Sequence, residues 1–177
     1  SNFPEGDAVL QPFIKRTVGS ILAAVLSVSF VCAAPQLAKA YSLIGTKQKF
    51  YYDNVVPFQW GRLTEDDTEW TEIFRQAANS WNTAQDEIEW GYLSGSSNVM
   101  QVYYDDNNER EYGRTQIKIS NGVITLAWME INQATVSDKS SKFKRSVATH
   151  ELGHGLGLND TSSSPAIMNQ NRDRNTI

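Results

Sequence analysis

Hydrophobic and polar residues alternate along this chain with two periods, and each period predicts one type of element. Between residues 70 and 81, apolar side chains recur three or four positions apart, which predicts an amphipathic α-helix. Its apolar positions are Trp70, Ile73, Phe74, Ala77, Ala78 and Trp81. Thr64, followed three residues later by Asp67, is typical of a capping box, so we expect the helix to begin near Thr64.

Short runs of apolar, aromatic and β-branched residues predict β-strands. The predicted strands are residues 47–53, 87–92, 98–104, 115–120 and 123–128. The last two flank Asn121-Gly122, a dipeptide that accepts the positive φ angles of a type I′ turn, so we expect them to form a β-hairpin. A polar loop, residues 105–109, precedes this hairpin.

The last predicted element is a helix that begins near Ser140 or Ser141. Its expected stripes are Phe143, Val147, His150 and His154 on one side, and Ala148, Leu152 and Leu156 toward a core. The order of elements is a strand, a helix, several strands and a helix. This order predicts an α+β fold in which helices pack on a mixed sheet.

The first forty residues have the pattern of a secretory leader. Lys15 and Arg16 precede an uncharged apolar run over residues 18–34, and a small-x-small sequence of the kind that signal peptidase reads ends at Ala40. A retained membrane anchor is the alternative, but the run is shorter than the ~20 residues that a span needs. We therefore predict a leader with a signal peptide, residues 1–40, cleaved after Ala40, and one compact domain, residues 41–177.

Composition and charge limit the partners of this protein. Hydrophobic residues make up 40% of the 177 residues, an ordinary share for a globular protein. The net charge is -4 and the basic residues are scattered, so we expect no nucleic-acid partner. Cys32 is the only cysteine, which excludes an internal disulfide and a multi-thiolate metal site. Histidine and carboxylate would have to hold any metal ion.

The last predicted helix contains the metal-binding pattern His150-Glu151-Leu152-Gly153-His154. Residues four apart lie one above the other on a helix, so both imidazoles should point at one place where a single Zn²⁺ can bind them. Glu151 would project beside them, within reach of water at the metal. Gly157 can end the helix in a positive-φ turn, which lets Asp160 return as a third ligand. Three protein ligands leave the open position that catalysis requires.

The histidines support this interpretation by their number as well as by their spacing. His150 and His154 are the only two in the chain. Scattered surface histidines would not concentrate at this spacing, in a helix that is predicted independently. The sequence therefore predicts one catalytic zinc site with His150, His154 and Asp160 as ligands.

Residues 150–160, together with the Ser-Pro-Ala-Ile-Met sequence that ends at Met168, resemble the metzincin zinc proteases. In that family, a turn carrying a methionine follows the zinc-binding helix. The eight-residue step from Asp160 to Met168 is most similar to the matrixin branch, particularly to its small secreted bacterial members. Snapalysin-like enzymes are the second choice, because they use an aspartate as third ligand.

The resemblance implies a fold and a role for each site residue. The fold would be a twisted mixed sheet with a long N-terminal helix and an active-site helix, here lacking the family's closing C-terminal helix. Met168 would form the apolar floor beneath a zinc ion held by His150, His154 and Asp160. Glu151 would be the general base that activates the zinc-bound water. An extended substrate would bind antiparallel to an edge strand, for which residues 113–119 are the best candidate.

The expected protein is thus a secreted, monomeric zinc-dependent endopeptidase that acts on extended protein or peptide segments, with no stable membrane association after signal cleavage. The alternative is a catalytically weak zinc-bearing binding module with a protease-like fold. The intact Glu151 favours the enzyme. Calcium is a second cofactor to consider, since carboxylates in residues 105–109 could bind it, although such runs are more often solvated turns.

Overall fold

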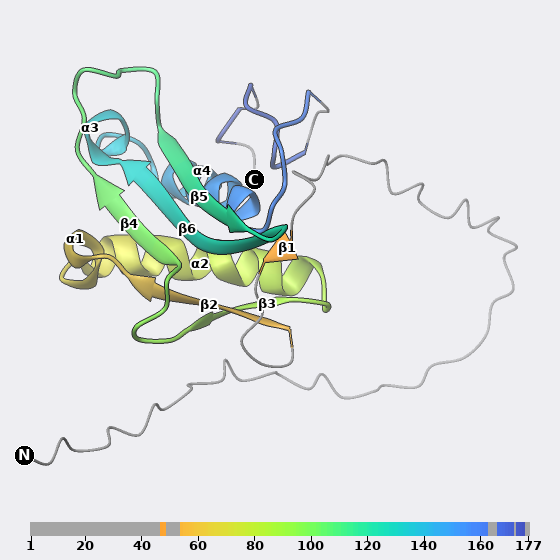
Figure 1. Cartoon of the computed structure of the whole chain (residues 1–177). Coiled ribbons are helices and arrows are strands. Elements are labelled where there is room, and N and C mark those ends of the chain that lie inside the picture. The colour runs from red at the N-terminus through yellow and green to blue at the C-terminus, as the bar shows by residue number, and fades with distance from the viewer. Residues whose placement is uncertain (1–46, 49–53, 163–165, 172, 176–177) are drawn as a thin grey trace, which may run out of the picture.

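The computed structural model describes residues 47–48, 54–162, 166–171 and 173–175 of the chain. The strands, labelled in Figure 1, are β1 (Lys47–Gln48), β2 (Val55–Trp60), β3 (Glu89–Tyr92), β4 (Val99–Tyr103), β5 (Gly113–Ser120) and β6 (Val123–Asn132). The helices are α1 (Arg62–Glu65), α2 (Thr68–Ala84), α3 (Gln133–Val136) and α4 (Ser141–Gly155). These elements confirm the predicted α+β class, with a long helix ahead of the hairpin and the motif-bearing helix behind it.

All six strands belong to one mixed sheet. The strand order is β1-β6-β4-β2-β3. Strand β5 is not part of this order and pairs with β6. The β5–β6 pair is antiparallel, whereas the other pairs are parallel. Among the described residues, β5 pairs with β6 alone, so one of its two sides is an open edge of the sheet.

Helices α2 and α4 pack against each other and against the strands (Figure 1). The core between them is made of apolar side chains that are almost completely removed from water. From the sheet these include Val56, Phe58, Trp90, Met100, Val102, Ile124, Ala127, Met129 and Ile131, and from α4 they include Phe143, Val147, Ala148 and Leu152. Such close packing holds α4 at a fixed position against β5 and β6. It therefore also fixes the histidines that α4 carries.

Helix α2 begins later than the sequence predicts. Its N-cap is Asp67, whose carboxylate accepts hydrogen bonds from the backbone N–H groups of Glu69 (2.9 Å) and Trp70 (3.3 Å). Thr64 belongs to the separate helix α1, and its hydroxyl accepts a hydrogen bond from the backbone N–H of Val102 (3.0 Å). The predicted capping box is therefore wrong. The apolar stripe of α2 is buried as predicted.

Helix α4 begins where the sequence predicts and is buried along most of its length. Its N-cap is Ser140, whose hydroxyl accepts a hydrogen bond from the backbone N–H of Phe143 (3.2 Å). In its last turn, Gly153 allows another segment to lie directly on the helix, because a Cβ atom there would collide with the Sδ atom of Met168. The segment that carries Met168 can therefore pack directly against the helix.

The predicted strands agree with the structure in most places. The hairpin around Asn121-Gly122 is confirmed, with φ angles of 52° and 73° at the turn. The strands predicted at 87–92 and 98–104 are confirmed as β3 and β4. Of the strand predicted at 47–53, only β1 is described, because residues 49–53 lie outside the described residues.

Strand β2 is missing from the sequence-based prediction. Proline is unfavourable within a sheet because it has no N–H to donate, and Pro57 stands in the middle of this strand. The structure accepts it because β4 pairs only with Gln59 and Trp60, beyond the proline. The carbonyl of Pro57 instead accepts hydrogen bonds from the side chains of Ser96 and Asn98, each at 2.9 Å.

The predicted leader, residues 1–40, lies outside the described residues. Among the helices that the structure describes, none combines the length and the apolar character that crossing a membrane requires. In the described residues beyond α4, the chain forms turns and a short bridge between Thr161 and Asn169, without a further helix.

Candidate metal centre

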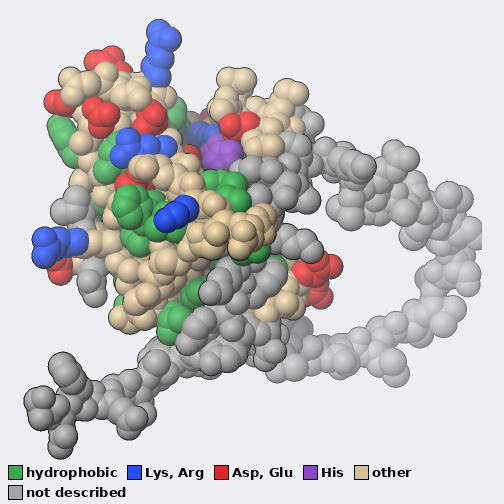
Figure 2. Space-filling model, in the orientation of Figure 1, with side chains coloured by type: hydrophobic (Ala, Val, Ile, Leu, Met, Phe, Trp, Pro, Cys, Tyr) green, Lys and Arg blue, Asp and Glu red, His purple; other side chains and the backbone are tan. Residues whose placement is uncertain are grey.

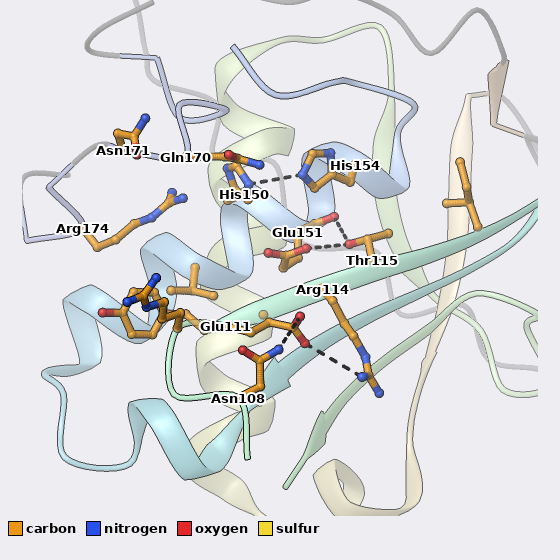
Figure 3. A pocket seen from close by; sticks show the side chains of 15 residues that line it. Asn108, Glu111, Arg114, Thr115, His150, Glu151, His154, Gln170, Asn171 and Arg174 are labelled. Atoms are coloured by element: carbon orange, nitrogen blue, oxygen red, sulfur yellow. Dashed lines mark hydrogen bonds and ion pairs between the residues drawn. The ribbon is translucent and has the colours of Figure 1, made fainter. Parts of the chain in front are cut away.

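His150 and His154 lie one helical turn apart on α4 and face the same place (Figure 3). Their Nε2 atoms are 3.2 Å apart, and their ring planes are nearly perpendicular, at 85°. The side chain of His150 is 7% exposed and that of His154 is 20% exposed. Histidine is also visible at the surface in Figure 2, so the place that the two rings face is open to solvent.

The other ring nitrogen of each histidine is held by a backbone carbonyl. Nδ1 of His150 donates to the carbonyl oxygen of Ile167 (3.0 Å), and Nδ1 of His154 donates to that of Leu158 (2.8 Å). A carbonyl oxygen can only accept, so Nδ1 carries the hydrogen in both neutral rings. Each Nε2 therefore presents a lone pair, which is the arrangement of a metal-ligating histidine.

These two lone pairs make the site suitable for a cation. At 3.2 Å, two facing Nε2 lone pairs repel each other unless a positive charge lies between them. A metal ion would supply that charge and bind both nitrogen atoms. The donor set of this structure thus fits a divalent metal ion.

Asp160 adds a carboxylate to the same place. Its Oδ1 atom lies 3.2 Å from Nε2 of His150 and 3.5 Å from Nε2 of His154. Potential ligand atoms of the three residues all lie within 4.8 Å of one another. Gly157, with a φ of 90°, makes the turn that returns the chain toward the helix. Two imidazoles and one carboxylate are a ligand set that zinc accepts.

Gln170 holds Asp160 from the other side. Its Nε2 group donates a hydrogen bond to Oδ2 of Asp160, the oxygen that does not face the histidines. Asp160 is 36% exposed, so its side chain gains little orientation from packing alone. The hydrogen bond from Gln170 therefore directs the carboxylate toward the two imidazoles.

The surroundings of His150 keep its imidazole neutral. The pKa of His150 is lowered to about 4, first by burial and then by the positive charge of Arg174. Only the neutral ring has a lone pair to give to a metal ion. At neutral pH, His150 is thus already in the form that binds metal.

Glu151 lies beside the group of three potential ligands rather than within it (Figure 3). Its side chain is buried, and the hydroxyl of Thr115 on β5 donates to its Oε2 atom at 2.9 Å. The pKa of Glu151 is raised to about 8. Burial causes the rise, and the hydrogen bond from Thr115 opposes it in part. A carboxyl group with a pKa near neutral pH is suited to both taking up and releasing a proton.

The segment with Met168 packs on α4 at the level of the histidines. Met168 is fully buried, and its Sδ atom lies over Gly153, the residue before His154. The backbone forms a turn in which the N–H of Asn169 donates to the carbonyl of Ala166 (3.0 Å). The structure therefore brings Met168 to the helix that carries the metal group.

A cavity of 630 Å³ opens beside Glu151 and the histidines. Figure 3 shows its surroundings: β5 on one side and the C-terminal residues Gln170, Asn171 and Arg174 on the other. Gly113 is needed where β5 approaches α4, since a Cβ there would lie 2.9 Å from both the Glu130 carbonyl oxygen and Cγ1 of Val147. The predicted edge segment thus lines the cavity that contains the metal group.

No protein-family model matches this chain, and no curated protein matches it. Among solved structures, the chain is similar to high choriolytic enzyme 1, a hatching enzyme zinc-protease from Oryzias latipes, the medaka fish. The TM-score is 0.43 and the sequence identity is 14%, with 64% of this chain and 50% of that chain covered. The chain thus spans half the length of that structure.

The sequence-predicted residues His150, His154 and Asp160 form one cluster, with Glu151 and Met168 beside it, but the sequence assigned no individual role to three of the residues around it. Thr115, Gln170 and Arg174 all line the cavity and carry no motif of their own. The loop at residues 105–109 does not gain support as a calcium site. Among the described residues, the only cluster of three or more potential metal-binding side chains is that of the two histidines and Asp160.

The raised pKa of Glu151 predicts a pH-dependent stability in the metal-free protein. The folded state takes up a proton on Glu151 as the pH falls through about 8, whereas the unfolded state does so only near the ordinary value of 4.5. The free energy of unfolding should therefore rise by about 1 kcal/mol between about pH 8.5 and about pH 7.

Urea denaturation of the metal-free protein at these two pH values measures this difference. Glu151→Gln, which cannot take up the proton, should show the same stability at both. An equal rise in wild type and variant would assign the proton uptake to another group.

Proposed function

We propose that this chain is a zinc-dependent endopeptidase of the metzincin type. The observation that carries the proposal is the position of Glu151, a buried carboxylate next to a His-His-Asp group and open to a cavity. A purely structural metal site has no need for a proton-accepting group beside its ligands. The binding-module alternative leaves Glu151 without a role.

The metal group and Glu151 would divide the chemistry between them. His150, His154 and Asp160 would hold zinc, which when bound supplies Lewis acidity toward the carbonyl of the scissile peptide bond. In its ionised form, Glu151 would accept a proton from the attacking water and then give that proton to the nitrogen of the leaving amine. The peptide bond is thereby hydrolysed.

The edge of β5 provides a place for the substrate backbone. Among the described residues this side of β5 has no neighbouring strand, and Gly113, Arg114, Thr115 and Ile117 line the cavity. An extended peptide can add to such an edge through backbone hydrogen bonds, which do not depend on its side chains. We infer that β5 orients extended protein segments across Glu151 and the metal group.

Thr115 connects this strand to the base, so we predict an effect of its replacement. Thr115→Val keeps the side-chain shape but removes the hydroxyl that donates to Glu151. Losing one hydrogen bond to a charged group should reduce kcat/KM by about 10-fold. Zinc content should stay the same, since the Thr115 hydroxyl bonds to Glu151, which is not one of the three proposed ligands.

Steady-state cleavage of an internally quenched peptide measures this effect. Thr115→Ser retains the hydroxyl and is the matched control, with activity close to that of the wild type. If Thr115→Val is as active as Thr115→Ser, the hydroxyl does not orient the base.

Metal removal tests the proposed function as a whole. Cleavage of a mixed pool of quenched peptides should stop when zinc is removed with a chelator and return when zinc is added in a single equivalent. A second arm with magnesium should not restore it, because magnesium binds nitrogen ligands poorly. A protein that binds zinc tightly but cleaves nothing in the pool would support the binding module instead.

We further propose that the protein is secreted and most similar to matrixins in its active-site segment. The first point rests on the leader pattern at residues 1–40, and the second on the spacing of Asp160 and Met168. Mass spectrometry of the N-terminus after expression with its natural leader would test cleavage after Ala40.

A further inference from the structure

Trp81 joins helix α2 to the part of α4 that carries the two histidines. Its indole Nε1–H donates to the backbone carbonyl of Thr149 at 2.8 Å, and this hydrogen bond is buried. Thr149 directly precedes His150, so the bond lies next to the first proposed metal ligand. A buried indole N–H is costly to leave without an acceptor. The Thr149 carbonyl therefore fixes the position of the Trp81 ring against α4.

The ring of Trp81 also reaches the far end of the same helical turn. A Cβ atom added to Gly153 would lie 2.9 Å from Cζ2 of Trp81 and would collide with Sδ of Met168. Both side chains thus pack against Gly153, the residue before His154. Trp81 therefore contacts the residue before each histidine, one at either end of the turn that separates them.

The glycine on the other side of His154 has a similar environment. A Cβ atom added to Gly155 would lie 2.7 Å from Sδ of Met129 and 3.2 Å from Cη2 of Trp90. Nε1 of Trp90 has no hydrogen-bond partner among the described residues. Trp90 thus contributes packing to this end of α4, whereas Trp81 contributes packing and a hydrogen bond to the helix backbone.

The turn held by Trp81 sets the distance between the two imidazoles. The Nε2 atoms of His150 and His154 are 3.2 Å apart. Two nitrogen ligands of one tetrahedral zinc ion lie roughly 3.3 Å apart, because each Zn–N bond is about 2.0 to 2.1 Å long. The two rings project from opposite ends of the turn, so a change in the turn would change their separation. Such a change should lower the affinity for the metal ion.

We propose that Trp81 is a positioning residue of the metal centre, which holds the α4 turn between His150 and His154 through its indole N–H and the edge of its ring. This inference rests on the proposed function and adds a residue to its metal site. Packing in the apolar stripe of α2 is the only role that the sequence pattern predicts for Trp81. A phenylalanine could fill that role, but it could not donate to Thr149.

Zinc affinity separates the hydrogen bond from the packing. Trp81→Phe keeps an aromatic ring without the N–H group and should weaken zinc binding about 10-fold, measured by competition with a chromophoric chelator. Trp70→Phe is the matched control on the same helix. Trp70 is equally a buried tryptophan, but it lies near the start of α4, where Nζ of Lys144 is 5.1 Å from its ring. This control should bind zinc like the wild type, even if it unfolds at a lower urea concentration.

A closer analogue of tryptophan tests the hydrogen bond even if Trp81→Phe does not fold. 3-Benzothienylalanine at position 81 keeps the bicyclic shape and has sulfur in place of the N–H group. It should show the same loss of zinc affinity. Cobalt(II) gives a second measurement, because its visible absorption reports the arrangement of its ligands. At saturating cobalt, both Trp81 replacements should shift the absorption bands, and Trp70→Phe should not. A loss of packing alone would lower stability without shifting them.

The outcomes separate this inference from the proposed function. Wild-type zinc affinity and cobalt spectra in both Trp81 replacements would overturn the role of Trp81 and leave the endopeptidase intact. An equal loss of affinity in Trp70→Phe would overturn it as well. A wild-type protein that binds zinc but cleaves no peptide would contradict the endopeptidase and not this inference, which the zinc affinities decide. A wild-type protein that binds no zinc would overturn both.

Discussion

Glu151→Gln is expected to reduce kcat/KM for peptide cleavage by about 100-fold to 10,000-fold. Glutamine has nearly the same shape and can still accept the hydrogen bond that Thr115 donates to Oε2. It cannot take a proton from water, so the base is lost while the pocket is retained. Because Glu151 lies outside the group of potential ligands, zinc should remain bound at the same stoichiometry.

Quenched-peptide kinetics and zinc analysis on the same sample measure both parts of this prediction. Glu87→Gln is the matched control, since Glu87 is an exposed carboxylate just after α2 and does not line the cavity. Its activity should equal that of the wild type. Full activity of Glu151→Gln would show that another group accepts the proton.

The second large effect concerns the affinity for zinc. His154→Ala and Asp160→Ala each remove one of the three proposed ligands and should weaken zinc binding by more than about 100-fold. Gln170→Leu leaves the ligands in place but removes the hydrogen bond that directs Asp160. This variant should therefore weaken zinc binding less, by about 10-fold to 100-fold.

Competition with a chromophoric chelator gives the zinc affinity of each variant. Gln76→Leu on α2 is a matched control for Gln170→Leu, because Gln76 is exposed and does not line the cavity with the metal group. It should bind zinc like the wild type. Unchanged zinc binding by Asp160→Ala would exclude Asp160 as a ligand, and unchanged binding by His154→Ala would contradict the site itself.

The cluster could be predicted because most of its geometry is local. A spacing of four residues brings His150 and His154 to one face of a helix, and this holds for any packing around that helix. Gly157 then turns the chain back within a few residues of the helix end. The hairpin at Asn121-Gly122 was predictable for the same reason, since its two turn residues require positive φ angles.

The contacts that Thr115, Gln170 and Arg174 make in the site could not be predicted because they depend on tertiary structure. Thr115 reaches Glu151 only because β5 packs on α4, 36 residues away in the sequence. Arg174 and Gln170 reach the cavity through the path of the chain beyond α4, which no short pattern specifies. Thr64 shows that tertiary structure can also override a local pattern. Instead of capping a helix as its sequence pattern predicts, its hydroxyl accepts a hydrogen bond from the backbone N–H of Val102 on β4.

Digestion of an unstructured protein such as casein by the zinc-loaded chain is the most direct test of whether this chain is a zinc-dependent endopeptidase. Samples taken over time would be analysed by mass spectrometry for new N- and C-termini, with the zinc content of the protein determined in parallel. We expect cleavage at internal peptide bonds that stops when the zinc is chelated. Stoichiometric zinc with intact casein throughout the time course would contradict it.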